Sequence, residues 1–234
     1  MNEQTKTTQP SSLTNFFFYN KVSVSIIVLI MTLSASFISG IGALVSMGLM
    51  LLALVLCLKD GSVKMLGLTK PKSFGKTLLL GAVIGFSLQM VFKVIFDPLF
   101  EQLTGSQIDL SMLEELPGNL PLYLIWIAIG WIIGGFLEEM SFRGYLIPRV
   151  KYLLGGGTAA TVIAILASGI PFGIAHLYQG WAGVLSTGIF GILFGILFVL
   201  NKENVWLPIF IHGFANMTDL TLIYLGYGDS LSLF

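Results

Sequence analysis

Residues 181–200 read WAGVLSTGIFGILFGILFVL, a run of twenty without a charged side chain. A helix needs about 20 apolar residues to cross the hydrocarbon core of a bilayer, so this run is long enough to span one. Comparable runs recur along the chain, and seven segments are predicted to cross a membrane: 22–40, 41–58, 77–97, 120–138, 158–176, 181–200 and 206–225. The sequence therefore predicts an all-α, polytopic membrane helix bundle with about seven transmembrane helices.

The composition agrees with lipid as the main solvent. Of 234 residues, 55% are hydrophobic and 10% are charged, whereas a soluble domain carries roughly a quarter charged residues. Lys and Arg number 12, as do Asp and Glu, so there is no basic excess to attract nucleic acid. These values exclude a water-soluble globular protein, a disordered chain and a nucleic-acid binder. The single cysteine, Cys57, cannot form an internal disulfide and is interpreted as a small buried thiol.

Basic residues predict the orientation of the bundle, because cytoplasmic loops carry an excess of Lys and Arg. They fall on one side of the membrane if the N-terminus is cytoplasmic and the C-terminus is external: Lys6, Lys21, Lys59, Lys64, Lys70, Lys72, Lys76, Arg143, Arg149, Lys151 and Lys202. The loop 98–118 on the other side holds four acids and no base. Lys93 is the exception inside a span, and we expect Asp97, one helical turn later, to be its partner.

Charge and composition also divide the chain into three parts. Residues 1–76 comprise a polar tail, two spans and a basic linker; residues 77–119 comprise the third span and the acidic loop; and residues 120–234 hold most of the polar chemistry. The first two spans are joined only by the turn at 39–42, which predicts a tight helical hairpin.

Polar clusters interrupt the apolar runs of the third part. They read GGFLEEMSFRG (134–144), PFGIAHL (171–177) and IHGFAN (211–216), and they contain both histidines of the protein. Ionisable groups inside membrane spans are costly to bury, so they are functional candidates by default. Individually, a Glu–Arg pair is often a structural clamp, and a histidine or asparagine often joins helices by hydrogen bonds. Together they favour a functional polar site.

Helical spacing predicts how these side chains group. Glu139 and Arg143 stand at i,i+4 with the acid first, the favourable order for an ion pair. Glu138 points about 100° away and lacks that partner, so it suits a general base. His212 and Asn216 share a helical face and could donate hydrogen bonds to an oxyanion. Base, water, acid and oxyanion donors together describe a peptide-bond hydrolase without a covalent nucleophile.

The three clusters, in this order, resemble the motifs of the CAAX proteases and bacteriocin-processing or immunity proteins (the CPBP or Abi family). The resemblance covers residues 120–220 and rests on EExxxR at 138–143, FxxxH at 172–176 and HxxxN at 212–216. It implies an intramembrane endopeptidase that acts on a membrane-associated peptide or protein tail in a bacterial cell membrane.

The resemblance also implies individual roles. Glu138 and His176 would activate the water, His212 and Asn216 would form the oxyanion hole, and Glu139 and Arg143 would support the site. No cofactor is expected, although two Glu and two His could ligate zinc in principle. A glutamate-type, metal-independent enzyme is therefore favoured over a zinc metalloprotease.

Two other functions stay open. One is a membrane scaffold without proteolysis, such as an immunity protein or the partner of a sensor kinase. The other is a proton-coupled transporter, which the absence of a visible internal repeat disfavours. The sequence names neither the substrate nor the oligomeric state; the Gly130–Gly134 spacing favours helix packing within one molecule over packing between copies.

The depth of the site poses a further question. Counting spans places Glu138 near the cytoplasmic face and His176 near the outer face. A shared site requires either that the fourth helix continues past Glu138 towards Pro148, or that Pro171 breaks the fifth.

Overall fold

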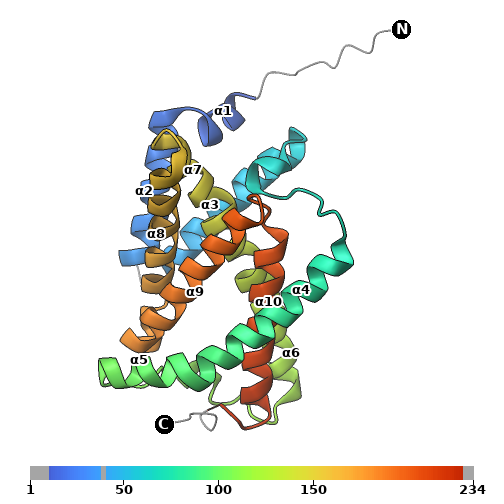
Figure 1. Ribbon diagram of the computed structural model, residues 1–234, viewed down its shortest axis with the longest axis vertical. Helices are drawn as coiled ribbons and strands as arrows, with labels where there is room; N and C mark the ends of the chain where they lie inside the picture. The colour runs from blue at the N-terminus through green and yellow to red at the C-terminus, as the bar shows by residue number, and fades with distance from the viewer. Residues whose placement is uncertain (1–10, 38–40, 229–234) are drawn as a thin grey trace.

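In the computed structural model, residues 11–37 and 41–228 are described, and every regular element among them is helical (Figure 1). The prediction of an all-α fold is confirmed. The α-helices are α1 (Ser12–Phe18), α2 (Lys21–Phe37), α3 (Ile41–Lys59), α4 (Phe74–Val91), α5 (Asp97–Thr104), α6 (Leu120–Ile129), α7 (Ile147–Leu153), α8 (Gly157–Ala175), α9 (Gly180–Leu200) and α10 (Trp206–Tyr224). Short 3₁₀ helices are η1 (Val63–Leu66), η3 (Ser111–Leu113) and η6 (Leu177–Gln179), and π-helical segments are η2 (Phe92–Phe96), η4 (Gly130–Glu138) and η5 (Met140–Leu146).

Four continuous helices in the described ranges are long and apolar enough to cross a membrane: Phe74–Thr104, Leu120–Leu153, Gly157–Ala175 and Leu177–Leu200. A fifth span is present if α1 and α2, bent by 60° at their junction, count as one. Leu44–Lys59 is a shorter apolar helix, and α10 is made less apolar by His212, Asn216 and Asp219. A polytopic membrane fold is confirmed, while the count of seven spans and the orientation stay predictions.

The fourth predicted span continues past Glu138, as one of the two alternatives required. It runs without interruption for 34 residues, from Leu120 through both π segments to Leu153. Glu138 therefore lies near the middle of a long helix rather than at its end. The alternative, that Pro171 breaks the fifth span, is wrong, because α8 continues through Pro171 to Ala175. His176 follows directly, at the C-terminal end of α8.

Glycines allow the helices around the site to approach closely. In Figure 1, α4 crosses α10, and Gly81 and Gly85 form the contact on α4. A Cβ atom at Gly85 would lie 3.0 Å from the Cβ of Phe214, and it would overlap the backbone of α10 at the Ile211 carbonyl. On the opposite side, Gly173 of α8 faces Gly188 of α9. Small residues at such crossings let backbones pack closely in lipid.

The N-terminal helices pack against this bundle. The Ser46 hydroxyl of α3 donates to the Met31 carbonyl of α2 at 3.1 Å, which joins the two helices of the predicted hairpin. The connecting residues 38–40 lie outside the described residues. One hydrophobic core contains side chains from α1, α2, α3, η5 and α8. The three-part division of the chain stays a prediction.

A row of hydrogen bonds attaches α1 to the end of the long helix. Tyr145, Arg149 and Tyr152 project from one side of that helix and donate to the carbonyls of residues 17–19, in that order, each at 2.7 Å. These carbonyls lie at the C-terminal end of α1, where a helix leaves its last acceptors without internal partners. We call this row the N-terminal clamp.

Candidate active site

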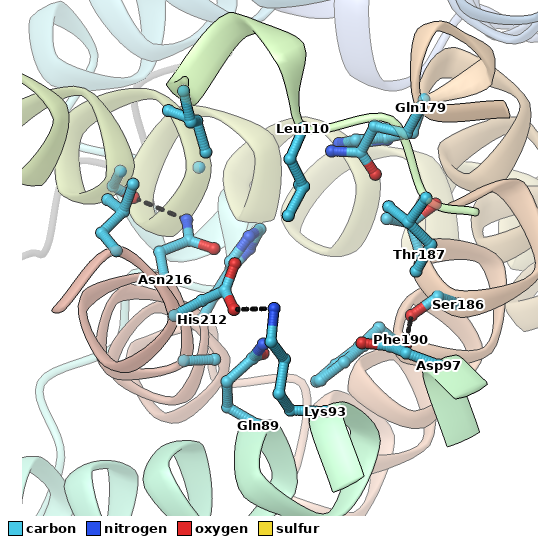
Figure 2. Close-up of a pocket in the computed structure, with 18 of the residues that line it drawn as sticks. Gln89, Lys93, Asp97, Leu110, Gln179, Ser186, Thr187, Phe190, His212 and Asn216 are labelled. Atoms are coloured by element: carbon cyan, nitrogen blue, oxygen red, sulfur yellow. Dashed lines mark hydrogen bonds and ion pairs between the residues drawn. The ribbon is translucent and has the colours of Figure 1, made fainter. Parts of the chain in front are cut away.

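A cavity of about 400 Å³ lies among the long helix, α4, α8, α9 and α10 (Figure 2). Four of the six predicted site residues line it: Glu138, His176, His212 and Asn216. They come from three helical segments that are far apart in sequence. The other two, Glu139 and Arg143, are fully buried behind the cavity wall.

Glu138 is the last residue of the π segment η4, and Glu139 lies between η4 and η5; in π-helical backbone, hydrogen bonds run from i to i+5 and the turn is wider than in an α-helix. Side chains of other helices bind carbonyls of these segments. The Asn216 amide donates to the Gly130 carbonyl at 3.0 Å, and the Ser168 hydroxyl donates to the Phe142 carbonyl at 2.8 Å. Such bonds satisfy backbone acceptors where water is scarce. The sequence motifs did not predict these π segments.

Behind the wall, Glu139 and Arg143 form the ion pair that their spacing predicted. The Nη1 atom of Arg143 lies 2.7 Å from Oε1 of Glu139, and both side chains have no exposed surface. The Nη2 atom donates to the Gly191 carbonyl of α9 at 3.1 Å. The guanidinium also lies over the Phe172 ring, 4.6 Å from its centre. We call Glu139 and Arg143 the buried pair.

The buried pair orients His212. The Nδ1 atom of His212 lies 2.8 Å from Oε1 of Glu139, the oxygen that also accepts from Arg143. An ionised carboxylate only accepts, so Nδ1 carries the hydrogen. The Nε2 atom is then directed to the cavity side, where it lies 3.9 Å from Oε2 of Glu138.

His176 is held in a similar way by backbone. Its Nδ1 atom lies 2.8 Å from the Phe172 carbonyl, which only accepts, so Nδ1 carries the hydrogen here too. The Nε2 atom of the neutral ring therefore has a free lone pair. The ring also lies against Phe172, with the ring centres 4.9 Å apart.

Glycines bring Asn216 and His212 up to the long helix. A Cβ atom at Gly134 would overlap the Asn216 amide nitrogen and lie 3.3 Å from Nε2 of His212. A Cβ atom at Gly130 would lie 3.2 Å from that of Asn216. The Gly130–Gly134 spacing therefore serves packing within the molecule, as predicted.

Comparison with known proteins was consistent with these motifs. A family profile described as "Type II CAAX prenyl endopeptidase Rce1-like" matches residues 120–218. Residues 120–218 belong to the CPBP family. This CPBP region contains every predicted site residue. The profile match leaves the N-terminal helices and α4 outside it.

A curated relative carries the same kind of name. The "Membrane-embedded CAAX protease MroQ" of Staphylococcus aureus (strain USA300) is 27% identical over 155 residues, which cover 60% of this chain and 56% of that protein. The match thus spans little more than half of the relative. No solved structure matches the chain. With its apolar helices, the chain is an integral membrane protein of the cell membrane.

Outside the CPBP region, the predicted partner of Lys93 is wrong. Its ammonium lies 3.4 Å from Oδ1 of Asp219 on α10, not beside Asp97. Asp97 instead accepts a hydrogen bond from the Ser186 hydroxyl of α9 at 2.6 Å. Lys93 lies within the π segment η2, and Asp97 is the first residue after that segment. All four side chains line the cavity.

The Glu and His side chains of the site are the donor types that a zinc ion would use. Across residues 11–37 and 41–228, no group of three or more His, Cys, Asp or Glu side chains is placed to hold an ion. Both histidines use Nδ1 for protein hydrogen bonds, which leaves Nε2 of each for further contacts.

Proposed function

We propose that the chain is a membrane-embedded endopeptidase that hydrolyses a peptide bond in a membrane-associated peptide or protein tail. The observation that supports this most directly is the shared cavity: Glu138, His176, His212 and Asn216 reach it from separate helices, and a buried ion pair lies behind them. The family profile and the name of the relative agree with this activity.

In the proposed reaction, Glu138 accepts a proton from a water molecule as the water attacks the scissile carbonyl. His176 accepts a hydrogen bond from that water through its free Nε2 lone pair. The proton taken by Glu138 is then relayed to Nε2 of His176, which passes it to the leaving amine as the C–N bond breaks. Because Nδ1–H of His176 is fixed to the Phe172 carbonyl, the ring keeps one orientation through both steps.

The oxyanion would be bound by His212 and Asn216. Nδ1–H of His212 is engaged with Glu139, so donation from Nε2 requires a ring that carries both hydrogens. Such an imidazolium would lie between two carboxylates, with Nε2 at 3.9 Å from Oε2 of Glu138 and Nδ1 at 2.8 Å from Oε1 of Glu139. Asn216 gives one amide hydrogen to Gly130 and keeps the second for the oxyanion.

We further propose that no metal takes part in the reaction. The support is the donor set described above, in which Glu139 is committed to Arg143 and His212 rather than to a shared ligand position. Glu138, His176 and His212 would have to move together to surround an ion.

The test is cleavage of a pool of palmitoylated, fluorescently labelled nonapeptides with random apolar positions, presented in liposomes. Wild type is compared with Glu138→Ala and His176→Ala, each with and without a chelator. We expect wild-type cleavage that both substitutions abolish and that the chelator leaves unchanged.

Each other result has a definite meaning. Loss on chelation and recovery with zinc would overturn metal independence but keep the protease. Cleavage that survives both substitutions would refute the site. Failure of folded wild type to cleave any pool would count against proteolysis and favour a scaffold.

A further inference from the structure

Lys93 is a cation in the cavity that the proposed reaction does not use. It belongs to the π segment η2 and extends into the cavity on the side of His212 and Asn216 (Figure 2). Its side chain is 11% exposed. Among the lining residues within the described ranges, it is the sole Lys or Arg. Burial of an ammonium is costly unless its donors have partners.

Lys93 has few partners for such a buried group. An ammonium has three donors, and the one charged group that forms an ion pair with Lys93 in the described part of the chain is Asp219, at 3.4 Å. Other acids of the cavity have partners of their own. Asp97 accepts from the Ser186 hydroxyl, and Glu101 accepts from the Ile108 amide at 2.9 Å. The Lys93 ammonium therefore has donors left for a ligand.

The position of Lys93 relative to the reaction groups follows from α10. His212, Asn216 and Asp219 stand at i, i+4 and i+7 on that helix and line one cavity. At 1.5 Å per residue, Asp219 lies about 10 Å along the axis from His212. An extended peptide covers about 3.3 Å per residue. A substrate group at Lys93 would thus be two or three residues from a carbonyl held by His212 and Asn216.

We propose that Lys93 binds a carboxylate of the substrate, two or three residues from the scissile bond, and so determines specificity. The carboxylate is either the free C-terminus of the peptide or an Asp or Glu side chain. The inference rests on the proposed function, because the distance is counted from the proposed oxyanion site. A purely structural ion pair that fastens α4 to α10 is the competing explanation for Lys93 and Asp219.

Binding is measured in the Glu138→Ala background, so that the probes are not consumed. The probes are the palmitoylated nonapeptide pool as free acid, the same pool as C-terminal amide, and amidated pools with Asp or Asn fixed third from the end. Fluorescence anisotropy in liposomes gives the affinities. The added variants are Lys93→Met and, as a matched control on the same helix, Lys76→Met, whose side chain is exposed at the start of α4.

We expect a carboxylate probe to bind about tenfold more tightly than its neutral counterpart. Lys93→Met should reduce that preference to less than twofold, and Lys76→Met should leave it unchanged. Preference for the free acid would identify the C-terminus, and preference for Asp over Asn would identify a side chain. The proposal would be overturned if wild type showed no preference for a carboxylate, or if Lys93→Met lowered the affinity for all probes equally.

This experiment also separates the two proposals. Selective binding without cleavage by wild type would refute the protease and keep the carboxylate site. Cleavage by wild type without charge selectivity would refute the role of Lys93 and keep the protease.

Discussion

Glu138 and Glu139 are neighbours in sequence, yet they occupy opposite environments. Glu138 faces the cavity, where its Oε2 atom lies 3.9 Å from Nε2 of His212. Glu139 is fully buried and shares one oxygen between Arg143 and His212 at 2.7 and 2.8 Å. The cavity wall thus keeps its groups free to react, while the buried pair fixes their positions. Substitutions in the two layers should therefore affect different quantities.

The largest effect should come from the cavity wall. Glu138→Gln keeps the size of the side chain but removes the base, so we expect kcat to fall at least about a thousandfold. Unfolding stability should change by less than about 0.5 kcal/mol, because the carboxylate has no short hydrogen bond to lose. Peptide cleavage and thermal unfolding in detergent give the two values. A large loss of stability would place Glu138 with the buried pair instead.

The buried pair should show the reverse. Arg143→Met leaves Glu139 as an uncompensated buried charge, and we expect a loss of about 3–5 kcal/mol of unfolding free energy. Denaturant titration in mixed micelles measures it. The double variant Arg143→Met, Glu139→Leu should recover most of that stability, because both charges are gone. It should stay inactive, since His212 loses its acceptor. If the double variant did not recover its stability, the buried pair would contribute more than the mutual neutralisation of its two charges.

Gly134, where the long helix contacts Asn216 and His212 of α10, should give an intermediate effect when it is substituted. Gly134→Ala places a methyl group against the Asn216 amide and close to His212, so we expect about 1–3 kcal/mol of destabilisation and a lower kcat. Gly75→Ala in α4 is the matched control, because a Cβ atom there meets nothing within 4 Å. The control should be neutral or stabilising by about 0.5–1 kcal/mol. Equal results for both would mean that the contact at Gly134 is loose.

The smallest effect is expected away from the cavity, at the N-terminal clamp. Tyr145→Phe removes the hydroxyl that binds the Phe17 carbonyl, which should cost about 1 kcal/mol. Tyr227→Phe, at a half-exposed tyrosine, should cost nothing measurable. Thermal unfolding distinguishes them. An unchanged melting temperature in Tyr145→Phe would show that α1 is held by its apolar contacts alone.

Local spacing was enough to predict some of this site. Glu139 and Arg143 pair as their i,i+4 separation requires, and the three polar clusters do meet at one cavity. The Lys93 partner was wrong, because Asp97 is bound by Ser186 of α9 instead, a contact between helices that spacing along one helix does not contain. Asp219 could not be assigned either, since its contact with Lys93 depends on the crossing of α4 and α10.

The membrane-spanning helices were likewise predicted only in part. Apolar length predicted the helices but left the continuity of Leu120–Leu153 as one of two alternatives, because it depends on π segments whose carbonyls are bound by Ser168 and Asn216 from other helices. A break at Pro171 was the other alternative, and it is wrong because α8 continues through that residue. The polar face of α10 lowers the mean hydropathy of that helix, because its side chains that line the cavity are polar.

The π segments determine the phase of the long helix, that is, the direction in which each side chain faces. A π turn accommodates about one residue more than an α turn, so the residues after it face a different way than they would after an α turn of the same number of residues. If the π segments were regular α-helix, each π turn that was lost would rotate everything beyond it by about 100° relative to Gly130. Glu138 would turn from the cavity while Arg143 left the interior, with no side chain altered. In this helix, the register of the backbone hydrogen bonds is as strict a requirement as chemical identity.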